Sequence, residues 1–279
     1  MGLSSERKAY LDKLCNKFRR DVIKVLHSIQ TGHPGGSLSV CEILTTLYFE
    51  KASVDPQNPY WEDRDRIVLS KGHAAPMLYR VLAEKGFFPV EEMSTLRQLN
   101  SRLQGHPSAK STPGVELSTG PLGLGLSAAL GMALGLKVLG KNSYVYAILG
   151  DGELNEGTIW DAAMSAYKFK ADNLIAIVDW NRVQLDGTTE EIMPSLDLRA
   201  KFEAFGWHVV ECDGHDVSQI SDAIDEAKAK KGLPSVILAH TVKGKGVSFM
   251  EGKNTWHGNP IDDESYRIAM AELGGDECE

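Results

Sequence analysis

Apolar residues recur at helical spacing through the first thirty positions of the chain. They stand three and four residues apart, at Leu11, Leu14, Phe18, Val22, Val25, Leu26 and Ile29. This spacing predicts a long amphipathic helix over 5–30 with one buried face. The pattern stops at the sequence GHPGG, residues 32–36. A second helix is predicted to start near Ser37, whose hydroxyl can cap it, and to run towards Phe49.

Beyond this region, short apolar runs alternate with helical patterns. Strands are predicted at 66–70, 144–149, 174–179, 207–211 and 235–240. Helices are predicted through Leu78 and Leu82, and over 126–140, 155–168 and 217–230. The alternation indicates one α/β domain over 1–279, with a mostly parallel sheet and helices on both faces. Ligands in such sheets bind outside the carboxyl ends of the strands.

Two irregular segments stand out. Residues 98–120 are rich in Ser, Pro, Gly and His without periodicity, which makes an unusually long loop, and long ordered loops tend to be functional. The pattern Gly123-x-Gly125-x-x-Ala128 superficially matches a dinucleotide-binding fingerprint. No apolar strand precedes it, and the true strand follows the helix, so small-residue packing and diphosphate contact explain it better.

Charge and cysteine content exclude several classes of protein. The formal net charge is −8 and basic residues form no run, so neither a nucleic acid nor a membrane surface is an expected partner. Cys15, Cys41, Cys212 and Cys278 are far apart in the sequence and form no Cys-x-x-Cys pair, which fits a reducing compartment. The charged N-terminal segment does not resemble a signal peptide, and we expect a cytoplasmic protein.

A carboxylate and an amide follow two apolar strands thirty positions apart. Asp151 comes after the strand at 144–149, and Asn181 comes after the strand at 174–179. That separation is the length of a βαβ unit, so neighbouring strands would bring both side chains to one edge of the sheet. Their oxygens suit Mg²⁺, with a diphosphate completing the shell, whereas an isolated Gly-Asp-Gly is more often an ordinary turn.

Several further segments, taken in order, resemble the N-terminal region of the transketolase family. They are GHPGG, DRIVLSKGHAAPMLY, QGHP, STGPLGLG, GDGELNEG, WNRVQLDG, KGKGVSFME and WHGNP, which extend from residue 32 to residue 260. The resemblance implies the thiamine-diphosphate-binding fold, with thiamine diphosphate and Mg²⁺ or Ca²⁺ as cofactors. It implies a metal site formed by Asp151, Asn181 and the carbonyl of Val183.

The same resemblance implies roles for other side chains. Cofactor contacts would come from Lys71, His73, Gly120, Leu122, Gly152, Asn181, Lys243 and His257. Catalytic positions, which contact the sugar oxygens or move protons, would be His33, His73, His106 and His257. Glu156 would join a polar network between cofactor sites, although a dipole-favoured acidic residue at a helix start is the simpler interpretation.

Simpler interpretations exist for the histidines and lysines as well. A histidine beside glycine in a loop is usually a surface residue, and a lysine there is usually solvated. None of the four catalytic candidates has the His-x-x-x-His spacing of a zinc site. His215 is interpreted as part of a helix-entry turn, and no chemistry is assigned to His27, His208 or His240. Gly36 stands where some relatives carry serine, so sugar specificity can differ.

The family resemblance also indicates what this chain does not contain. Transketolases activate their cofactor with a glutamate from a second, pyrimidine-binding domain, and this chain ends before any such region. We therefore expect a whole subunit that works with a C-terminal transketolase subunit in an α₂β₂ assembly and acts on sugar phosphates of the pentose phosphate type. The reaction would transfer a two-carbon ketol unit from a ketose to an aldose.

Three alternatives stay open at this stage. The α subunit of a 2-oxo acid dehydrogenase also carries GDG with a downstream Asn, although GHPGG, SKGHAAP and WHGNP favour sugar chemistry. A non-catalytic regulatory paralogue would be expected to lose metal or histidine positions. A 1-deoxyxylulose-phosphate synthase would join these domains in one longer chain.

Overall fold

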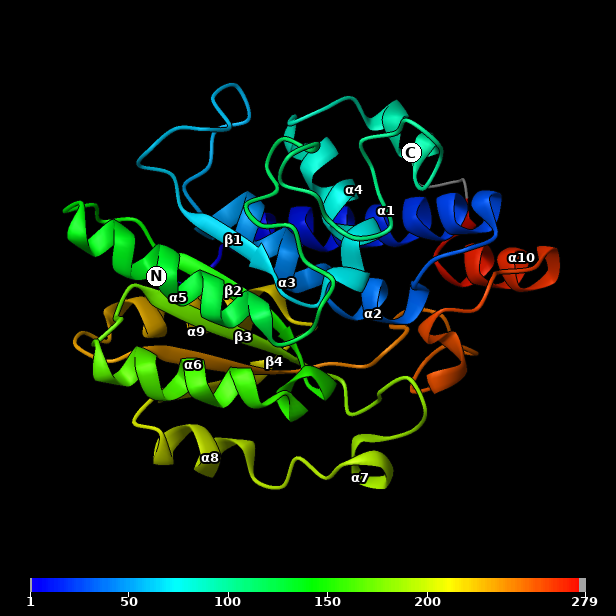
Figure 1. Ribbon diagram of the computed structural model, residues 1–279. Coiled ribbons are helices and arrows are strands. Elements are labelled where there is room, and N and C mark those ends of the chain that lie inside the picture. Colours follow the sequence, from blue (N-terminus) through cyan, green and yellow to red (C-terminus); the bar gives the residue numbers. More distant parts are fainter. Residues whose placement is uncertain (1, 276–279) are drawn as a thin grey trace.

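The computed structural model describes residues 2–275 and contains a five-stranded sheet in which every pairing is parallel (Figure 1). The strand order is β1-β2-β3-β5-β4. The strands are β1 (Arg66–Leu69), β2 (Val145–Gly150), β3 (Leu174–Trp180), β4 (His208–Asp213) and β5 (Ser235–His240). All five predicted strands are confirmed, with ends shifted by one or two residues.

Helices and single helical turns connect the strands. The α-helices are α1 (Ser5–Ile29), α2 (Pro34–Ser39), α3 (Cys41–Thr46), α4 (Ala75–Lys85), α5 (Leu124–Val138), α6 (Gly157–Lys168), α7 (Thr189–Ile192), α8 (Leu198–Ala204), α9 (Val217–Ala229) and α10 (Asp263–Glu272). Shorter turns are the π-helix η1 (Leu47–Lys51) and the 3₁₀ segments η2 (Gly72–Ala74), η3 (Val90–Thr95), η4 (Gly152–Asn155) and η5 (Asn254–His257). The predictions missed α7 and α8.

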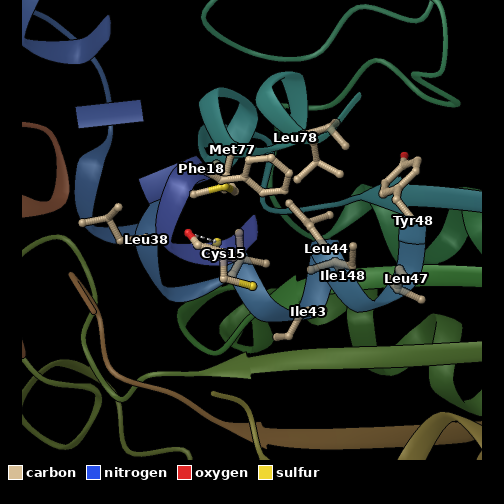
Figure 2. Packing of buried hydrophobic residues seen from close by; sticks show 14 of the residues in the cluster. Cys15, Phe18, Leu38, Ile43, Leu44, Leu47, Tyr48, Met77, Leu78 and Ile148 are labelled. Carbon is tan, nitrogen blue, oxygen red and sulfur yellow. Dashed lines mark hydrogen bonds between the residues drawn. The ribbon is translucent and has the colours of Figure 1, made fainter. Parts of the chain in front are cut away.

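Side chains of the central strands alternate between two cores, as the pleat of a buried sheet requires. Tyr146 and Ile148 of β2 face a core built with α1, α3, α4 and α9, whereas Ala147 and Leu149 face a core built with α5 and α6. Figure 2 shows the first core, where Phe18 of α1 and Met77 of α4 lie above Ile148. The predicted sheet with helices on both faces is therefore confirmed.

The start of the second helix differs from the prediction. The segment GHPGG is not a break before a helix, because α2 begins at Pro34 and includes both glycines. Proline is well suited to the first helical turn, where its missing N–H costs nothing. Ser37 lies inside α2 and does not cap it, and its buried hydroxyl has no hydrogen-bond partner within residues 2–275.

Cysteines that are far apart in the sequence are not all far apart in space. The Cys41 thiol donates a hydrogen bond to the Cys15 carbonyl at 3.4 Å, and Cys15, Cys41 and Cys212 are buried free thiols. Cys278 lies outside the described residues. Within those residues, the structure contains no helix with the length and apolar content needed to cross a bilayer.

Candidate active site

Asp151 and Asn181 meet at the carboxyl edge of the sheet. Their strands β2 and β3 are hydrogen-bonded neighbours, with Gly150 opposite Asp179 in the register. One oxygen of Asp151 accepts a hydrogen bond from the backbone N–H of Arg182, and the other accepts from Gly152 at 2.8 Å. The spatial convergence predicted from the thirty-residue spacing is thus present.

The Asp151 carboxylate is buried without a cation beside it. Its residue is 2% exposed, and it has two backbone N–H partners but no ion pair among the described residues. Burial, together with the nearby charge of Asp179, raises the pKa of Asp151 to about 6. A buried carboxylate without an ion-pair partner strongly attracts a positive ion.

Asp179, at the end of β3, has a cation of its own. Lys71 forms a buried ion pair with it, and the hydroxyls of Ser39 and Thr241 donate to the same carboxylate, the former at 2.6 Å. Burial would raise the pKa of Asp179, but these partners outweigh burial and lower it. Lys71 also donates to the carbonyl of Gly36 at 3.1 Å, so its ammonium is held on several sides.

Lys243 reaches the carbonyl predicted to bind the metal. Its Nζ donates to the Val183 carbonyl at 3.0 Å and lies 2.9 Å from Nδ1 of His257. Burial, followed by repulsion from Lys71, lowers the pKa of Lys243 to about 8. An ammonium therefore interacts with one of the three predicted metal-ligand oxygens in this structure.

These groups border a cavity of about 200 Å³. The predicted site residues that line it are Lys71, His73, Leu122, Asp151, Gly152, Asn181, Val183, Lys243 and His257. Gly120 lies next to the ring of His106, since a Cβ built on it would be 3.5 Å from His106 Cγ. His33, His106, Gly120 and Glu156 do not line this cavity.

The four candidate catalytic histidines nevertheless form one cluster. The ring centre of His33 lies 5.6 Å from that of His73, 5.9 Å from that of His106 and 5.5 Å from that of His257. The rings of His73 and His257 are 5.0 Å apart. Residues more than two hundred positions apart thus converge in one cluster, of which His73 and His257 line the cavity.

The surroundings of these histidines favour the neutral form of the ring. Burial, followed by nearby positive charges, lowers the pKa of His33 to about 4 and that of His257 to about 3. The same causes lower the pKa values of His73 and His106. A neutral imidazole can donate through one ring nitrogen and accept through the other, which suits contact with hydroxyl groups and proton movement.

The long loop predicted at 98–120 carries His106 into the cluster. Between η3 and α5 the backbone forms no regular helix or strand, but the Tyr79 hydroxyl donates to the His106 carbonyl at 3.2 Å. The hydroxyl of Thr119 donates to the Leu69 carbonyl of β1 at 2.8 Å. These hydrogen bonds hold a loop without periodicity in a defined position.

Gly35 explains part of the GHPGG segment. A Cβ at this position would lie 2.8 Å from the Trp256 carbonyl oxygen and 3.0 Å from Lys243 Cγ, closer than real side chains approach. The amide of Gly244 donates to the Gly35 carbonyl at 3.0 Å. Only glycine lets α2 pack directly against the segment that carries Lys243 and His257.

The glutamate that lines the cavity is Glu153 and not the predicted Glu156. Glu153 was not among the sequence candidates. Glu153 lines the cavity, is 2% exposed, and accepts hydrogen bonds from Ser70, from Gly123 at 2.8 Å and from Gly150 at 3.1 Å. Glu156 is exposed at the N-terminus of α6, and its side chain makes no capping hydrogen bond. Its predicted network across a subunit boundary stays a prediction.

Other site residues were also missed by the sequence patterns. They are Gln184 and Leu185 on the cavity wall, Ser39, Asp179 and Thr241 around Lys71, and Arg97 beside the histidines. Arg97 Nη2 lies 3.3 Å from Nδ1 of His33 and contributes to its lowered pKa. The pattern Gly123-x-Gly125-x-x-Ala128 does not lie in the context of a dinucleotide-binding fingerprint, because α5 precedes β2 and the Gly123 amide donates to Glu153.

Comparison with known proteins agrees with this geometry. The family model described as "Transketolase, thiamine diphosphate binding domain" matches residues 11–278. The chain is 46% identical to the 6-deoxy-6-sulfo-D-fructose transketolase subunit SqwG of Clostridium sp. (strain MSTE9), covering 96% of this chain and 98% of that one. It is 41% identical to an apulose-4-phosphate transketolase subunit of Phocaeicola vulgatus, covering 94% and 93%.

Longer relatives match over part of their length. Human transketolase is 43% identical over 94% of this chain, which corresponds to 42% of the human protein. The solved transketolase of Leishmania mexicana superposes with a TM-score of 0.91 at 33% identity, covering 95% of this chain and 41% of that one. The chain therefore belongs to the transketolase family, as a thiamine-diphosphate-dependent subunit of the kind found in two-chain transketolases.

Proposed function

We propose that this chain supplies the metal and diphosphate site of a two-chain transketolase and forms part of the surface that binds sugar. The proposal rests on two potential metal ligands at one edge of the sheet, the Asp151 carboxylate and the Val183 carbonyl. Within residues 2–275 the buried Asp151 carboxylate forms no ion pair, and the Val183 carbonyl accepts from the Lys243 ammonium. A divalent ion would bind to the oxygen atoms of both groups.

The donor set fits magnesium better than a transition metal. Asp151, Asn181 and the Val183 carbonyl offer hard oxygen atoms, and Mg²⁺ or Ca²⁺ prefers such ligands. Asn181 Oδ1 now accepts from the Val183 amide at 3.1 Å, so the two predicted ligands are already held together. The remaining positions of the metal would be filled by diphosphate oxygens and water.

Two lysines suit the diphosphate. Lys71 and Lys243 line the same cavity in a chain whose overall charge is −8, so they provide local positive charge where an anion needs it. The backbone of Gly152 and the side chain of Leu122 complete this wall. Gly120 and His73 would contact the cofactor beyond the phosphates, as would His257.

The histidines would then bind the sugar and transfer protons to and from it. When bound, thiamine diphosphate supplies a stabilised nucleophilic carbon. The neutral rings of His33, His73, His106 and His257 would hydrogen-bond the hydroxyl and carbonyl oxygens of the ketose and accept or return protons at their ring nitrogens. Burial keeps these rings uncharged, so they are available in both donor and acceptor roles.

A second subunit is needed in this proposal. Leu122 and Leu185 line the cavity and are 38% and 58% exposed, so the cavity has an apolar margin open to solvent. The exposed Glu156 stands at the same end of the sheet as Asp151. We propose that a C-terminal transketolase subunit with the pyrimidine-binding domain covers this margin in an α₂β₂ assembly in the cytoplasm.

The reaction class is proposed to be transfer of a two-carbon ketol unit between sugar phosphates. Transfer among pentose phosphates is the case expected from sequence. The names of two relatives specify 6-deoxy-6-sulfo-D-fructose and apulose 4-phosphate, so these two sugars belong in the same assay. The convergence of all four histidines favours sugar chemistry over a 2-oxo acid dehydrogenase or a regulatory paralogue.

The decisive experiment uses the chain alone and with its candidate partner subunit. Ketol transfer is measured over a panel of ketose donors in the presence of thiamine diphosphate and Mg²⁺. Activity is expected only for the pair. Robust transfer by the isolated chain would contradict the two-chain proposal, and oxidation of a 2-oxo acid by the pair would favour the dehydrogenase alternative.

A further inference from the structure

The turn between β4 and α9 carries a histidine with no role in the proposed chemistry. His215 is next to Gly214 in the sequence Cys-Asp-Gly-His-Asp, which from sequence is interpreted as a helix-entry turn. Its side chain is only 12% exposed, and both ring nitrogens have partners. Nδ1 lies 3.0 Å from Oε2 of Glu42, and Nε2 accepts a hydrogen bond from the Val242 amide at 2.8 Å.

These two contacts define which nitrogen carries the proton. A backbone amide can only donate, so Nε2 of His215 is the acceptor and is unprotonated. Nδ1 then carries the hydrogen and donates it to the Glu42 carboxylate. The imidazole therefore connects two groups: it donates to the Glu42 carboxylate and accepts from the Val242 amide.

Glu42 is itself firmly held. Its Oε1 lies 2.6 Å from Arg19 Nη1, and its Oε2 accepts from Arg19 Nη2 at 2.7 Å, with both residues buried. The same Arg19 nitrogen donates to the Leu38 carbonyl of α2 at 3.1 Å. A two-point contact between guanidinium and carboxylate fixes orientation as well as distance. The chain Arg19, Glu42, His215 thus forms a rigid support.

The turn also lies directly on the end of β5. A Cβ on Gly214 would be 2.4 Å from Thr241 Cγ2 and 3.0 Å from the His240 carbonyl oxygen. The Gly214 amide donates to that carbonyl at 2.8 Å. This close approach, which only glycine permits, brings the imidazole within reach of Val242.

Val242 stands between two residues of the candidate site. Before it, the Thr241 hydroxyl donates to Asp179, the ion-pair partner of Lys71. After it, Lys243 donates to the Val183 carbonyl and contacts His257. Rotation of the Val242 amide plane would therefore move both neighbouring side chains.

We propose that His215 is a positioning residue for the cofactor site, acting through the Val242 amide on Thr241 and Lys243. The inference rests on the proposed thiamine diphosphate site, and it adds a residue that contacts neither cofactor nor sugar. A histidine that merely fills space would stabilise the fold but would not need an acceptor aimed at this amide.

Two substitutions separate these possibilities. In His215→Gln the side-chain oxygen can reach the place of Nε2 and accept from Val242, whereas in His215→Asn the shorter side chain can replace only the contact with Glu42. Both remove the ring and cost similar packing, so they are matched for stability. Each keeps a different one of the two hydrogen bonds of the imidazole, so a defect in His215→Asn that is absent from His215→Gln assigns the effect to the hydrogen bond with the Val242 amide.

The first measurement is amide hydrogen exchange on the cofactor-free chain. Loss of one hydrogen bond is expected to speed exchange at Val242 by roughly five- to tenfold in H215N, with H215Q close to the original protein. The second is calorimetric titration with thiamine diphosphate and Mg²⁺. The Kd is expected to rise by about fivefold or more in H215N and by less than about twofold in H215Q.

The outcomes are distinguishable. Equal exchange in both variants and the original chain would overturn the hydrogen-bond link. Unchanged Kd in H215N, with tight binding by the original chain, would overturn the positioning role alone. Failure of the original chain to bind thiamine diphosphate both alone and together with the candidate partner subunit would overturn the proposed function, which is a separate result from the exchange measurement.

Discussion

The ends of β2 and β3 carry two buried carboxylates with opposite surroundings. Asp179 has Lys71 and two hydroxyl donors, and its pKa is lowered, whereas Asp151 has two backbone amides and no cation within residues 2–275, and its pKa is raised to about 6. Burial and neighbouring position in the sheet are shared, so the difference lies in the partners. Where the protein supplies its own cation the carboxylate is structural. Where it does not, we propose that the carboxylate binds a cation from solution.

The largest effect should come from breaking the satisfied pair. Lys71→Met leaves Asp179 buried without its cation, and removal of one partner from a buried ion pair costs about 3–5 kcal/mol of stability. Urea unfolding would measure the loss. The double variant Lys71→Met with Asp179→Asn should recover much of it, and a double variant no more stable than the single one would contradict the pairing argument.

The second prediction concerns the unsatisfied carboxylate. Asp151→Asn keeps an oxygen acceptor for one of the two backbone amides and removes the charge that would bind the metal. We expect the Kd for thiamine diphosphate with Mg²⁺ to rise by about 100-fold, since a single ligand of a metal site is lost. We also expect the free energy of unfolding of the metal-free chain to stay the same or increase, because an unpaired buried charge disappears.

A matched control lies at the opposite, amino-terminal edge of the sheet. Asp65 is buried and accepts from the amides of Ser53 at 2.9 Å and Tyr144 at 2.7 Å. Asp65→Asn should leave the affinity for thiamine diphosphate with Mg²⁺ unchanged. If Asp65→Asn weakened cofactor binding as much as Asp151→Asn, the contrast between the two edges would be wrong.

A further buried carboxylate, that of Glu42, extends the comparison to pH. Burial would raise the pKa of Glu42, but Arg19 and His215 outweigh burial and lower it to about 2. Because the folded-state pKa lies below the ordinary value of 4.5, the stabilisation is complete above about pH 4.5 and is lost as the pH falls towards 2.

Glu42→Gln should therefore be less stable than the original chain at pH 7, by leaving Arg19 without its counter-charge. The difference should shrink by roughly 2 kcal/mol between pH 6 and pH 3, as the original chain loses its charged pair. Urea unfolding at several pH values would test this. Parallel pH profiles would show that the Glu42 carboxylate does not govern acid stability.

The smallest effect is expected from magnesium alone. At about ten times its Kd, an ion that binds only the folded chain adds roughly 1.4 kcal/mol, which is a rise in Tm of about 2–4 °C. Calorimetric melting with and without Mg²⁺ would detect it. The Asp151→Asn variant should show no such rise, and an equal rise in both would place the ion elsewhere.

Sequence periodicity was sufficient to predict the sheet and the meeting of Asp151 with Asn181, since strand ends in a parallel sheet share an edge. It could not predict Asp179 as a site residue, because an acidic residue after an apolar run has no signal until Lys71, 108 positions earlier, is brought beside it. The start of α2 was misplaced because glycine is a poor helix former locally, while the close packing of Gly35 on Trp256 favours it.

For the histidines too, the sequence pointed to the residues, and only the packing of the chain explains their pKa values. His33, His73, His106 and His257 were identified through the resemblance to transketolases, and their lowered pKa values follow from burial and from Arg97 and Lys243, which no spacing rule reveals. His215 received no role from sequence because its partners Glu42 and Val242 are 173 and 27 positions away.

The contact of Gly35 with Trp256 also has a consequence for biosynthesis. One side of the cavity is made by α2, near the start of the chain, and the side against which it packs comes from residues 243–257. During translation, β1, β2, β3 and His33 leave the ribosome well before Lys243 and His257 do. We therefore expect the cavity to form, and the proposed cofactor to be retained, only after residues 243–257 have left the ribosome.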